Sequence, residues 1–252
     1  MDAEVDKWAS RYPHLRECIP RVTHLVGALR ENPQAEFEAR FGLVDARNRF
    51  QTGVSRDDID RVLDMMQSSS HITGESEWTE EQDFFFQGAD GDMHRTRVRY
   101  TSEDMQVRAQ TIKKHDLGQE TFQVFYGAEN AGCDMRVSLK MEEPIVRMQT
   151  CVKTTLVRIK QRRRFTTADA LWAFDFAMLW SGASKTEAEQ MQAASDPQFE
   201  IECELIDPVK ALAVHSDARI AISLLLKMCD LLPPVQSVAT VRVERVPART
   251  TG

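Results

Sequence analysis

The chain has 252 residues, of which 42% are hydrophobic, so it can build the core of one large domain or two small ones. The formal net charge of −7 gives no overall basic field, so any polyanion site must come from local clustering of the 32 lysines and arginines. The five cysteines are widely spaced without a C-x-x-C pair, which excludes a zinc knuckle or disulfide framework and indicates a reducing compartment. No apolar run has membrane length, so we expect a soluble protein of the cytosol or nucleus with no membrane partner.

The amino-terminal 33 residues are predicted to form a helical cover. Apolar residues recur there at helical spacing, and prolines interrupt the pattern. A charged strand follows over residues 36–42. Because side chains alternate along a strand, Glu36, Glu38 and Arg40 share one face, and the opposite face is apolar.

The middle of the chain is predicted to be a run of short strands. A helix over about 55–67, capped by Ser55, precedes a polar connection over 68–81 that shows no periodicity. Strands then dominate residues 83–180, with turn signals at 88–91, 117–118 and 130–132. This spacing indicates a barrel or a sandwich.

The carboxyl-terminal part alternates helices with strands. The pattern predicts a short helix over 184–194, a strand over 199–205, a long helix over 208–231 and a last strand over 238–246. No repeat or linker is present. We therefore predict one catalytic domain over 34–246, following the cover over 1–33 and followed by a tail over 247–252.

Two of the predicted strands carry rows of carboxylates. Glu200, Glu202 and Glu204 share one face of the strand 199–205, as Glu36 and Glu38 do near the start of the chain. Carboxylates two residues apart lie about 6.5–7 Å from each other and repel unless a cation compensates. Oxygen clusters of this kind suit Mg²⁺ or Mn²⁺. Either strand alone also fits an ordinary antiparallel sheet with one wetted face.

Other strands carry rows of basic residues. On the strand 156–165, one face holds Arg158, Lys160, Arg162 and Arg164. The strands 95–100 and 135–142 add Arg95, Arg97 and Arg99, and Arg136, Ser138, Lys140 and Glu142. A solvated edge strand is an equal alternative for a single row. In the strand 171–180, Asp175 is the lone charge.

A closed barrel would satisfy all of these rows at once. If every charged face turns inward, the sheet encloses a polar lumen and its apolar outside is covered by helices. Such a lumen suits a polyphosphate held by arginines and lysines, with a metal on the carboxylates. We therefore expect metal-assisted hydrolysis by water. No H-x-x-x-H, G-x-x-x-x-G-K-S/T or G-x-S-x-G motif supports another chemistry.

The order of these motifs resembles the triphosphate tunnel metalloenzymes, and more specifically the metal-dependent mRNA 5′-triphosphatases of the fungal, protozoal and viral type. The resemblance covers about residues 34–210. It rests on E-F-E-A-R-F-G at 36–42, R-V-S-L-K-M-E-E-P at 136–144, R-I-K-Q-R at 158–162, Asp175 and E-I-E-C-E at 200–204. It implies an α+β, mainly β fold: an eight-stranded antiparallel β-barrel, the triphosphate tunnel fold, with helices packed on the outside. The implied activity removes the γ-phosphate from 5′-triphosphate RNA in mRNA cap formation, with Mn-dependent hydrolysis of NTPs as a side activity.

The resemblance also implies roles for single residues. As metal ligands for Mn²⁺ or Mg²⁺ it implies Glu36, Glu38 and Glu204, with Glu200 and Glu202 beside them and Glu202 acting through water. As phosphate-binding residues it implies Arg158, Lys160 and Arg162, helped by Arg136, Lys140, either Arg97 or Arg99, and either Lys113 or Lys114. Glu142 would orient or deprotonate the attacking water, and Asp175 would support the basic row. Arg40 departs from the E-x-E-x-K pattern of the other superfamily branch, and the family pattern does not require Arg164.

Two alternatives remain open from the sequence. One is a tunnel-fold inorganic triphosphatase or other small-phosphate hydrolase, and the other is a non-catalytic anion-binding barrel. The resemblance further implies 5′-triphosphate RNA, NTP or polyphosphate as ligands, an mRNA guanylyltransferase as a partner, and a nuclear location.

Overall fold

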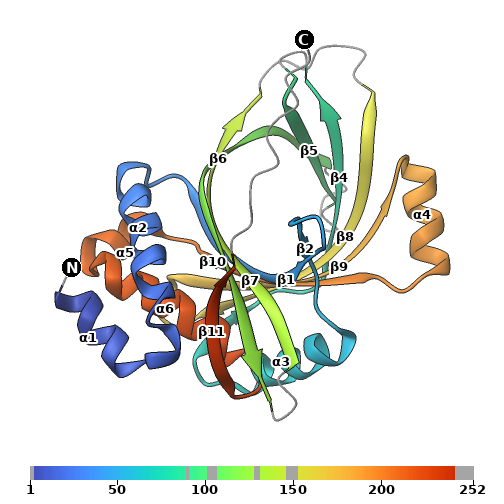
Figure 1. The fold of residues 1–252 in the computed structure, drawn as a ribbon. Helices are drawn as coiled ribbons and strands as arrows, with labels where there is room; N and C mark the ends of the chain where they lie inside the picture. Colours follow the sequence, from blue (N-terminus) through green and yellow to red (C-terminus); the bar gives the residue numbers. More distant parts are fainter. Residues whose placement is uncertain (1–2, 89–90, 101–106, 128–130, 146–152, 242–252) are drawn as a thin grey trace.

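The computed structural model describes residues 3–88, 91–100, 107–127, 131–145 and 153–241. Its centre is a closed β-barrel of eight antiparallel strands (Figure 1). The barrel strands are β1 (Glu36–Val44), β4 (Thr79–Gln87), β5 (Met93–Tyr100), β6 (Val107–Tyr126), β7 (Ala131–Pro144), β8 (Thr154–Thr167), β9 (Trp172–Gly182) and β10 (Gln198–Leu205). They follow the order β10-β9-β8-β4-β5-β6-β7-β1 around the barrel, and β1 pairs with β10 to close it. The predicted eight-stranded antiparallel barrel is confirmed.

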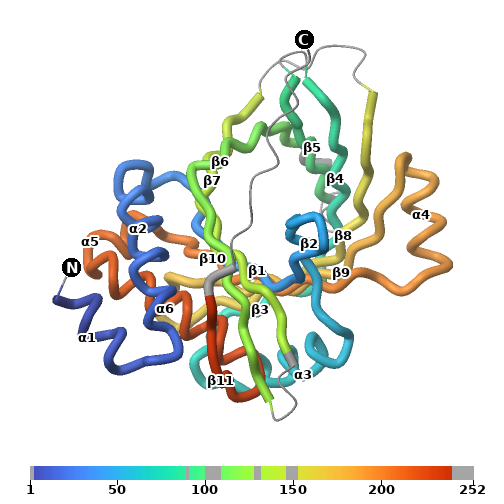
Figure 2. Tube along the Cα trace, viewed as in Figure 1, coloured from blue at the N-terminus to red at the C-terminus, as the bar shows by residue number. Residues whose placement is uncertain are grey.

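Three shorter strands extend this sheet. The strand β2 (Phe50–Thr52) pairs with β1, β3 (Ile72–Glu75) pairs with β8, and β11 (Val235–Val241) pairs with β6. Figure 2 shows the blue trace of β1 beside the orange trace of β10, although they come from distant parts of the chain. The closing pair therefore joins two segments that each carry glutamates.

Helices cover the outside of the barrel, as expected. They are α1 (Ala3–Arg11), α2 (Cys18–Glu31), α3 (Arg56–Ser68), α4 (Lys185–Ala194), α5 (Pro208–Val214) and α6 (Asp217–Asp230), with a 3₁₀ turn at Pro13–Leu15. In Figure 1, α1, α2, α5 and α6 lie on one side of the barrel and α4 lies on the other. Among the described helices, none is long and apolar enough to cross a membrane.

Alternation along each strand explains why the core lies outside the barrel wall. In β1, Phe37, Ala39 and Phe41 are fully buried against the helices, while the glutamates between them point to the interior. The opposite wall follows the same rule, because Val157 and Ile159 of β8 pack with Ala188 of α4. Burial of these apolar faces fixes the strand register and so turns every charged row inward.

Three sequence predictions of local structure are wrong. The connection predicted over 68–81 contains β3 and the start of β4. The turn predicted at 117–118 is a β-bulge within β6, where the Gly118 N–H donates to Asp116 Oδ1 at 3.1 Å. The long helix predicted over 208–231 is two helices, because His215 is extended and Ser216 Oγ caps α6 by accepting from the Arg219 N–H.

Several other predicted elements are confirmed with small shifts of their ends. The helix predicted over 55–67 is α3 with Ser55 as its cap, and the helix predicted over 184–194 is α4. The last strand ends at Val241 in the described part of the chain. Residues 242–246 of that predicted strand and the predicted tail over 247–252 lie outside the described residues.

Gly42 offers a test of the β1–β2 packing. A Cβ at this position would lie 2.3 Å from the Gln51 carbonyl oxygen, so we expect Gly42→Ala to destabilise the fold by about 1–3 kcal/mol. The measurement is the free energy of urea unfolding. Gly27→Ala is the matched control, because its Cβ would meet nothing closer than 4.0 Å and alanine favours helix α2 by up to about 1 kcal/mol. Equal stability of the two variants would contradict the close packing at Gly42.

Candidate active site

The barrel interior contains a polar cavity of about 270 Å³. Among the described residues, its lining is charged with the exception of Gln110 and Ile112. The basic members are Arg40, Arg95, Arg97, Arg99, Lys114, Lys160, Arg162 and Arg164, and the acidic members are Glu36, Glu142, Asp175, Glu202 and Glu204. A cavity with so many ionisable groups inside a fold of this size is a strong candidate for a functional site.

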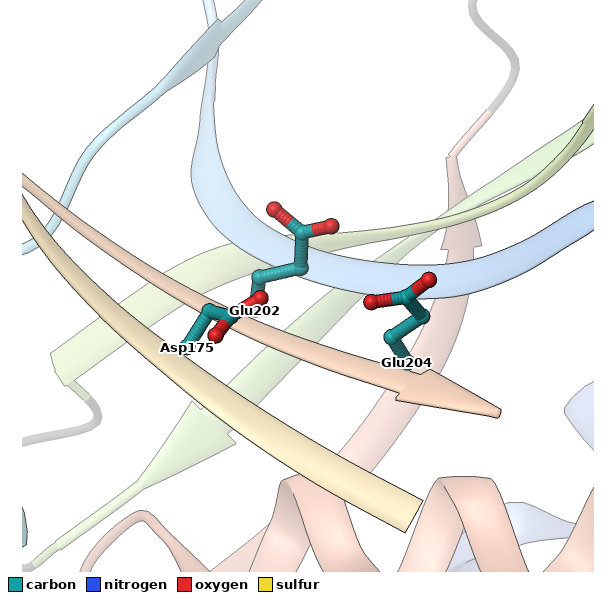
Figure 3. Close-up of side chains that lie close together, drawn as sticks. All are labelled: Asp175, Glu202 and Glu204. Carbon is teal, nitrogen blue, oxygen red and sulfur yellow. The ribbon is translucent and has the colours of Figure 1, made fainter. Parts of the chain in front are cut away.

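The acidic side of the cavity lies where β1, β10 and β9 meet. Glu38 of β1 is the cross-strand partner of Glu204, and Glu202 is the partner of Asp175. Directly opposed residues on one face have Cβ atoms about 4.5–5.5 Å apart, so the closing of the barrel brings these carboxylates together. Asp175, Glu202 and Glu204 each offer one oxygen within 4.8 Å of the others (Figure 3).

Buried hydrogen bonds hold Glu38 beside this cluster. Its side chain is 1% exposed and accepts from Arg40 at 2.8 Å, from Ser138 Oγ at 3.1 Å and from Lys140 at 3.2 Å. Burial alone would raise the pKa of Glu38, but Arg40, a hydrogen bond with Glu202 and Lys140 hold this pKa well below its usual range. Glu38 is therefore ionised.

Glu202 has the opposite electrostatic environment. Burial raises the pKa of this carboxyl, and the negative charge of Glu38 raises it further, although Arg40 lies 2.9 Å from Glu202 Oε2. Two carboxylates in such close contact share a proton more readily than they both ionise. A divalent cation would remove the need for that proton, since it compensates both charges.

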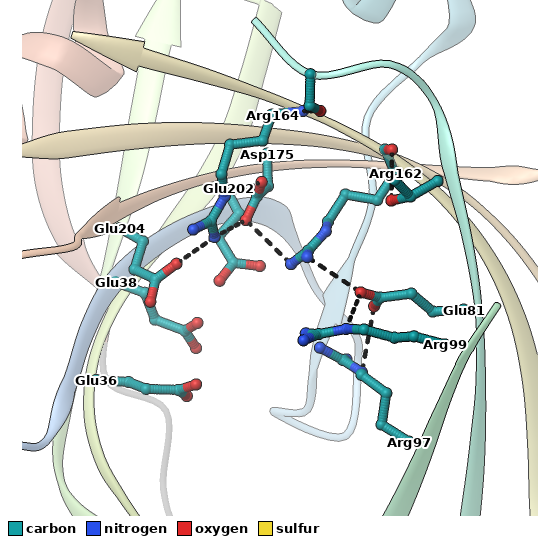
Figure 4. A network of polar contacts seen from close by, with 12 residues as sticks. Glu36, Glu38, Glu81, Arg97, Arg99, Arg162, Arg164, Asp175, Glu202 and Glu204 are labelled. Carbon is teal, nitrogen blue, oxygen red and sulfur yellow. Dashed lines mark hydrogen bonds and ion pairs between the residues drawn. The ribbon is translucent and has the colours of Figure 1, made fainter. Parts of the chain in front are cut away.

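The basic side of the cavity is organised by Glu81 of β4, which is 1% exposed. Arg99 Nε donates to Glu81 Oε1 at 2.7 Å, and Arg162 Nη2 lies 3.0 Å from the same oxygen. Arg97 Nε lies 3.2 Å from Oε2 (Figure 4). Burial opposes the charge of Glu81, but the three guanidinium groups lower its pKa, so the carboxylate stays ionised and fixes all three arginines.

Asp83, two residues further along β4, continues this row. Arg97 donates to it through Nε at 2.7 Å and through Nη2 at 2.9 Å, and Arg95 Nε lies 4.0 Å away. A two-bond pair of this kind fixes the guanidinium plane as well as its position. The arginines of β5 are therefore oriented before any ligand enters.

Glu142 lies on a third part of the wall with Lys114. Its Oε1 atom accepts from Arg95 at 3.0 Å and lies 2.9 Å from Lys114 Nζ, which also contacts Glu36. Burial works to raise the pKa of Glu142, but Lys114 and hydrogen bonds with Lys114 and Glu36 lower it. Glu142 is thus ionised and can accept a hydrogen bond from a water molecule.

Lys160 differs from the other cations of the cavity. Its side chain is buried, at 7% exposure, and within the described part of the chain its ammonium makes no hydrogen bond or ion pair. Buried ammonium groups are normally paired with an anion. Lys160 is therefore poised to bind an anionic ligand without first leaving a carboxylate.

Ten of the predicted site residues line this cavity. They are Glu36, Arg97, Arg99, Lys114, Glu142, Lys160, Arg162, Asp175, Glu202 and Glu204. Both Arg97 and Arg99, which the sequence left as alternatives, reach it, and Lys114 rather than Lys113 is the lysine of β6 that does so. Asp175 lies against the basic row, 3.6 Å from Arg162.

Five predicted site residues do not line the cavity. Glu38 and Lys140 bond to each other in the wall, and Glu200 is buried, at 6% exposure, further along β10. Arg136 stacks on Phe50 at 4.4 Å and Arg158 stacks on Phe85 at 5.1 Å. Arg136 and Arg158 lie on the predicted faces of their strands. Each stands at the end of its charged row, however, where an aromatic side chain covers it.

Sequence reasoning overlooked the acidic row on β4. Glu81 and Asp83 alternate with Gln82, and this period of two is the only local signal for a charged strand face. The following run Phe84-Phe85-Phe86 breaks the alternation and hides it. Arg40, Arg95 and Arg164 were recognised in the sequence without an assigned role, and all three line the cavity.

Glu81→Gln tests whether this carboxylate positions the arginines. The change leaves three guanidinium groups without their shared anion, so we expect a loss of stability of about 3 kcal/mol, measured by urea unfolding. Glu80→Gln is the matched control, because Glu80 points outward on the same strand, and its effect should stay within about 0.5 kcal/mol. Equal effects of the two changes would contradict the positioning role.

A larger cavity lies outside the barrel. It has a volume of about 450 Å³ and is lined by apolar and polar residues in equal number, which come from α3, β3, β9, the end of α6 and the turn between β8 and β9. It contains no row of charges comparable to that of the barrel interior. The interior cavity is therefore the candidate active site.

Comparisons with known proteins agree with the geometry at the level of the fold. No protein family model matches this sequence, and no curated protein matches it either. The structure of S. pombe Pct1 RNA triphosphatase in complex with the Spt5 CTD matches with a TM-score of 0.61 and 16% identity, over 85% of this chain and 93% of that chain. Pct1 RNA triphosphatase alone matches with a TM-score of 0.57 and 17% identity, over 85% and 90%. The mimivirus capping enzyme triphosphatase matches with a TM-score of 0.54 and 14% identity, over 84% and 96%.

The closed eight-stranded barrel with its charged interior is thus the triphosphate tunnel fold that the sequence resembles. The chain shares this fold with the RNA triphosphatases of S. pombe and mimivirus. At these identities the comparison establishes the fold, and the chemistry must be argued from the cavity itself.

Proposed function

We propose that this chain is a metal-dependent RNA 5′-triphosphatase that hydrolyses the γ-phosphate of 5′-triphosphate pre-mRNA to a diphosphate end in cap formation. The observation that carries the proposal is one closed cavity with carboxylates on one side and fixed arginines on the other. In Figure 4, Glu36 and Glu204 lie opposite Arg97, Arg99 and Arg162, and the buried Glu38 lies beside them in the wall. The fold shared with RNA triphosphatases supports the same reaction.

The chemistry of the acidic side fits Mn²⁺ or Mg²⁺. Hard divalent cations take oxygen ligands, and carboxylates from two paired strands converge here. The residues that would hold the metal are Glu36, Glu38 and Glu204, with Glu202 beside them. When bound, the metal would neutralise phosphate oxygens and favour attack by water.

The residues of this chain would perform the remaining work. Lys160 and Arg162 would bind the triphosphate from β8, and Arg97 and Arg99 would bind it from β5. Since Glu81 and Asp83 already fix the arginines, the charges that stabilise the transferred phosphoryl group need little rearrangement. Glu142 would accept a hydrogen bond from the attacking water and orient it towards the γ-phosphorus.

The cavity volume limits what is recognised inside the barrel. About 270 Å³ lies below the usual range for pockets that enclose a whole ligand, roughly 300–1,000 Å³, and suits a triphosphate group. The nucleoside and the rest of the RNA would therefore lie outside the cavity. The same geometry supports hydrolysis of NTPs and tripolyphosphate, which carry the same group.

The proposal includes a nuclear location and an mRNA guanylyltransferase as a partner. A diphosphate RNA end is the product of the proposed reaction, and a guanylyltransferase is the class of enzyme that would consume it. Purification of the tagged chain from its host, followed by an assay for guanylyltransferase activity in the same complex, tests this partner.

The decisive experiment measures phosphate release from RNA labelled at its 5′ γ-phosphate. The reaction is run with Mg²⁺, Mn²⁺ or EDTA, and with unlabelled tripolyphosphate and ATP as competitors. Metal-dependent release from RNA at low enzyme concentration supports the proposal. Rapid hydrolysis of tripolyphosphate without release from RNA would favour a small-phosphate hydrolase, and no hydrolysis of any substrate would favour an anion-binding barrel.

A further inference from the structure

Arg164 of β8 lies on the acidic side of the cavity, where it contacts two carboxylates of the cluster. Its Nε donates to Asp175 Oδ1 at 2.8 Å, and its Nη2 donates to Asp175 Oδ2 and to Glu204 Oε2, both at 2.5 Å. One guanidinium therefore bridges two of the three carboxylates that lie within 4.8 Å of one another. Figure 4 shows these contacts on the side of Glu204 and Glu38, away from Arg97 and Arg99.

The backbone makes this arrangement specific to position 164. Arg164 is the cross-strand partner of Asp175 in the β8–β9 pair, and Asp175 is in turn the partner of Glu202. The two hydrogen bonds to Asp175 fix the plane of the guanidinium group. The same Nη2 atom that donates to Asp175 also donates to Glu204. Asp175 thus has both oxygens engaged by an arginine, whereas Glu204 offers only Oε2 and keeps Oε1 outside this contact.

The acidic and basic side chains around the cavity nearly neutralise one another. Among the described residues, eight basic side chains and five acidic ones line the cavity, and Glu38, Glu81, Asp83 and Lys140 lie behind the lining. Acidic and basic groups are therefore nearly balanced before any ligand enters. A metal can therefore bind the carboxylates there only by taking over interactions that the chain makes with itself, and apart from Lys160 the same holds for the cations that would meet a triphosphate.

We propose that Arg164 is an internal counterion of the acidic cluster and that it competes with the divalent metal for Glu204. Metal binding would release Nη2 from Glu204, while Asp175 would keep the guanidinium in the cavity. Arg164 would then face the phosphate that enters beside the metal. This inference rests on the proposed function, because it assumes the metal of that reaction.

The inference predicts how the metal affinity depends on position 164. Arg164→Gln removes the competing cation, so we expect Mn²⁺ to bind about tenfold more tightly than to the unchanged chain, measured by isothermal titration calorimetry. The metal-free variant should also melt at a lower temperature, because Asp175 and Glu204 lose their counterion, and Mn²⁺ should raise its melting temperature by a larger amount. Neither readout requires turnover. A residue that merely supported the ligands would have the opposite effect, since its loss would weaken the binding of Mn²⁺.

Two further variants separate direct competition for Glu204 from a general change in the electrostatic potential of the cavity. Arg99→Gln also removes one positive charge from the cavity lining, but Arg99 pairs with Glu81 and not with Glu204. Its Mn²⁺ affinity should change much less than that of Arg164→Gln. Arg164→Lys keeps the positive charge but loses the paired hydrogen bonds to Asp175, so it should bind Mn²⁺ with intermediate affinity. It replaces Arg164→Gln in the experiment if that variant does not fold.

The outcomes distinguish this inference from the proposed function. Tighter binding confined to the position 164 variants supports the inference. If the unchanged chain binds Mn²⁺ and Arg164→Gln binds it equally or more weakly, the inference is overturned and the metal-dependent function stands. Equal tightening in Arg99→Gln also overturns it, because the effect is then one of net charge. If no variant binds Mn²⁺, both the inference and the metal-dependent function are overturned.

Discussion

Glu204→Gln is expected to reduce metal-dependent phosphate release by about 10²- to 10³-fold while leaving the fold intact. Glu204 is the cross-strand partner of Glu38 at the closing pair of the barrel, and its carboxylate lies in the cavity beside Glu202 and Asp175. Glutamine keeps the shape of the side chain but removes the charge that would hold the metal. The measurement is the initial rate of phosphate release with saturating Mn²⁺, together with circular dichroism and the melting temperature. Full activity in this variant would rule out the proposed metal site.

Glu200→Gln is the matched control for this change. Glu200 lies on the same face of the same strand, but it is buried and does not line the cavity. We therefore expect a loss of activity of less than about tenfold. A loss equal to that of Glu204→Gln would place Glu200 in the ligand set together with Glu204.

Lys160→Gln is expected to reduce kcat/KM for triphosphate substrates by about 10²-fold with little change in stability. Among the described cations that line the cavity, Lys160 is the one without an ion pair, so its removal leaves no carboxylate without a partner. The effect should therefore appear in catalysis and not in unfolding. Steady-state kinetics with RNA and tripolyphosphate, compared with urea unfolding, measures both.

Arg158→Gln provides the comparison for Lys160→Gln. Arg158 lies two residues earlier on the same face of β8, but its guanidinium stacks on Phe85 and does not line the cavity. A much smaller loss of kcat/KM is expected. If Arg158→Gln were the more damaging change, the triphosphate would have to extend further along β8 than the cavity described here.

The sequence allowed the barrel to be predicted because charged and apolar residues alternate along most of β1, β8 and β10. In these strands a period of two separates a charged face from a mainly apolar one, and only inward-facing charge can satisfy all three at once. The same alternation of side chains predicted which residues of these strands belong to the site. The alternation is strong because helices cover the outer face and the lumen is polar.

Other features could not be predicted because they depend on contacts between distant strands. The acidic row of β4 carries little local signal, and its meaning comes from pairing with β5 and β8, which brings Glu81 to three arginines. The bulge at Gly118 looks like a turn in sequence, and it is stabilised as a bulge by pairing with β7. The role of Arg164 likewise depends on its register opposite Asp175, which no single strand reveals.

The seam between β1 and β10 also has a consequence for folding kinetics. Glu38 and Glu204 are far apart in the chain and become neighbours only when β1 pairs with β10 and closes the barrel. Such long-range pairings impose a large loop-closure entropy and are late, slow events in the folding of β proteins. A divalent cation held across the seam would bind only the closed chain, and its stabilisation would therefore appear as slower opening of the barrel rather than as faster folding.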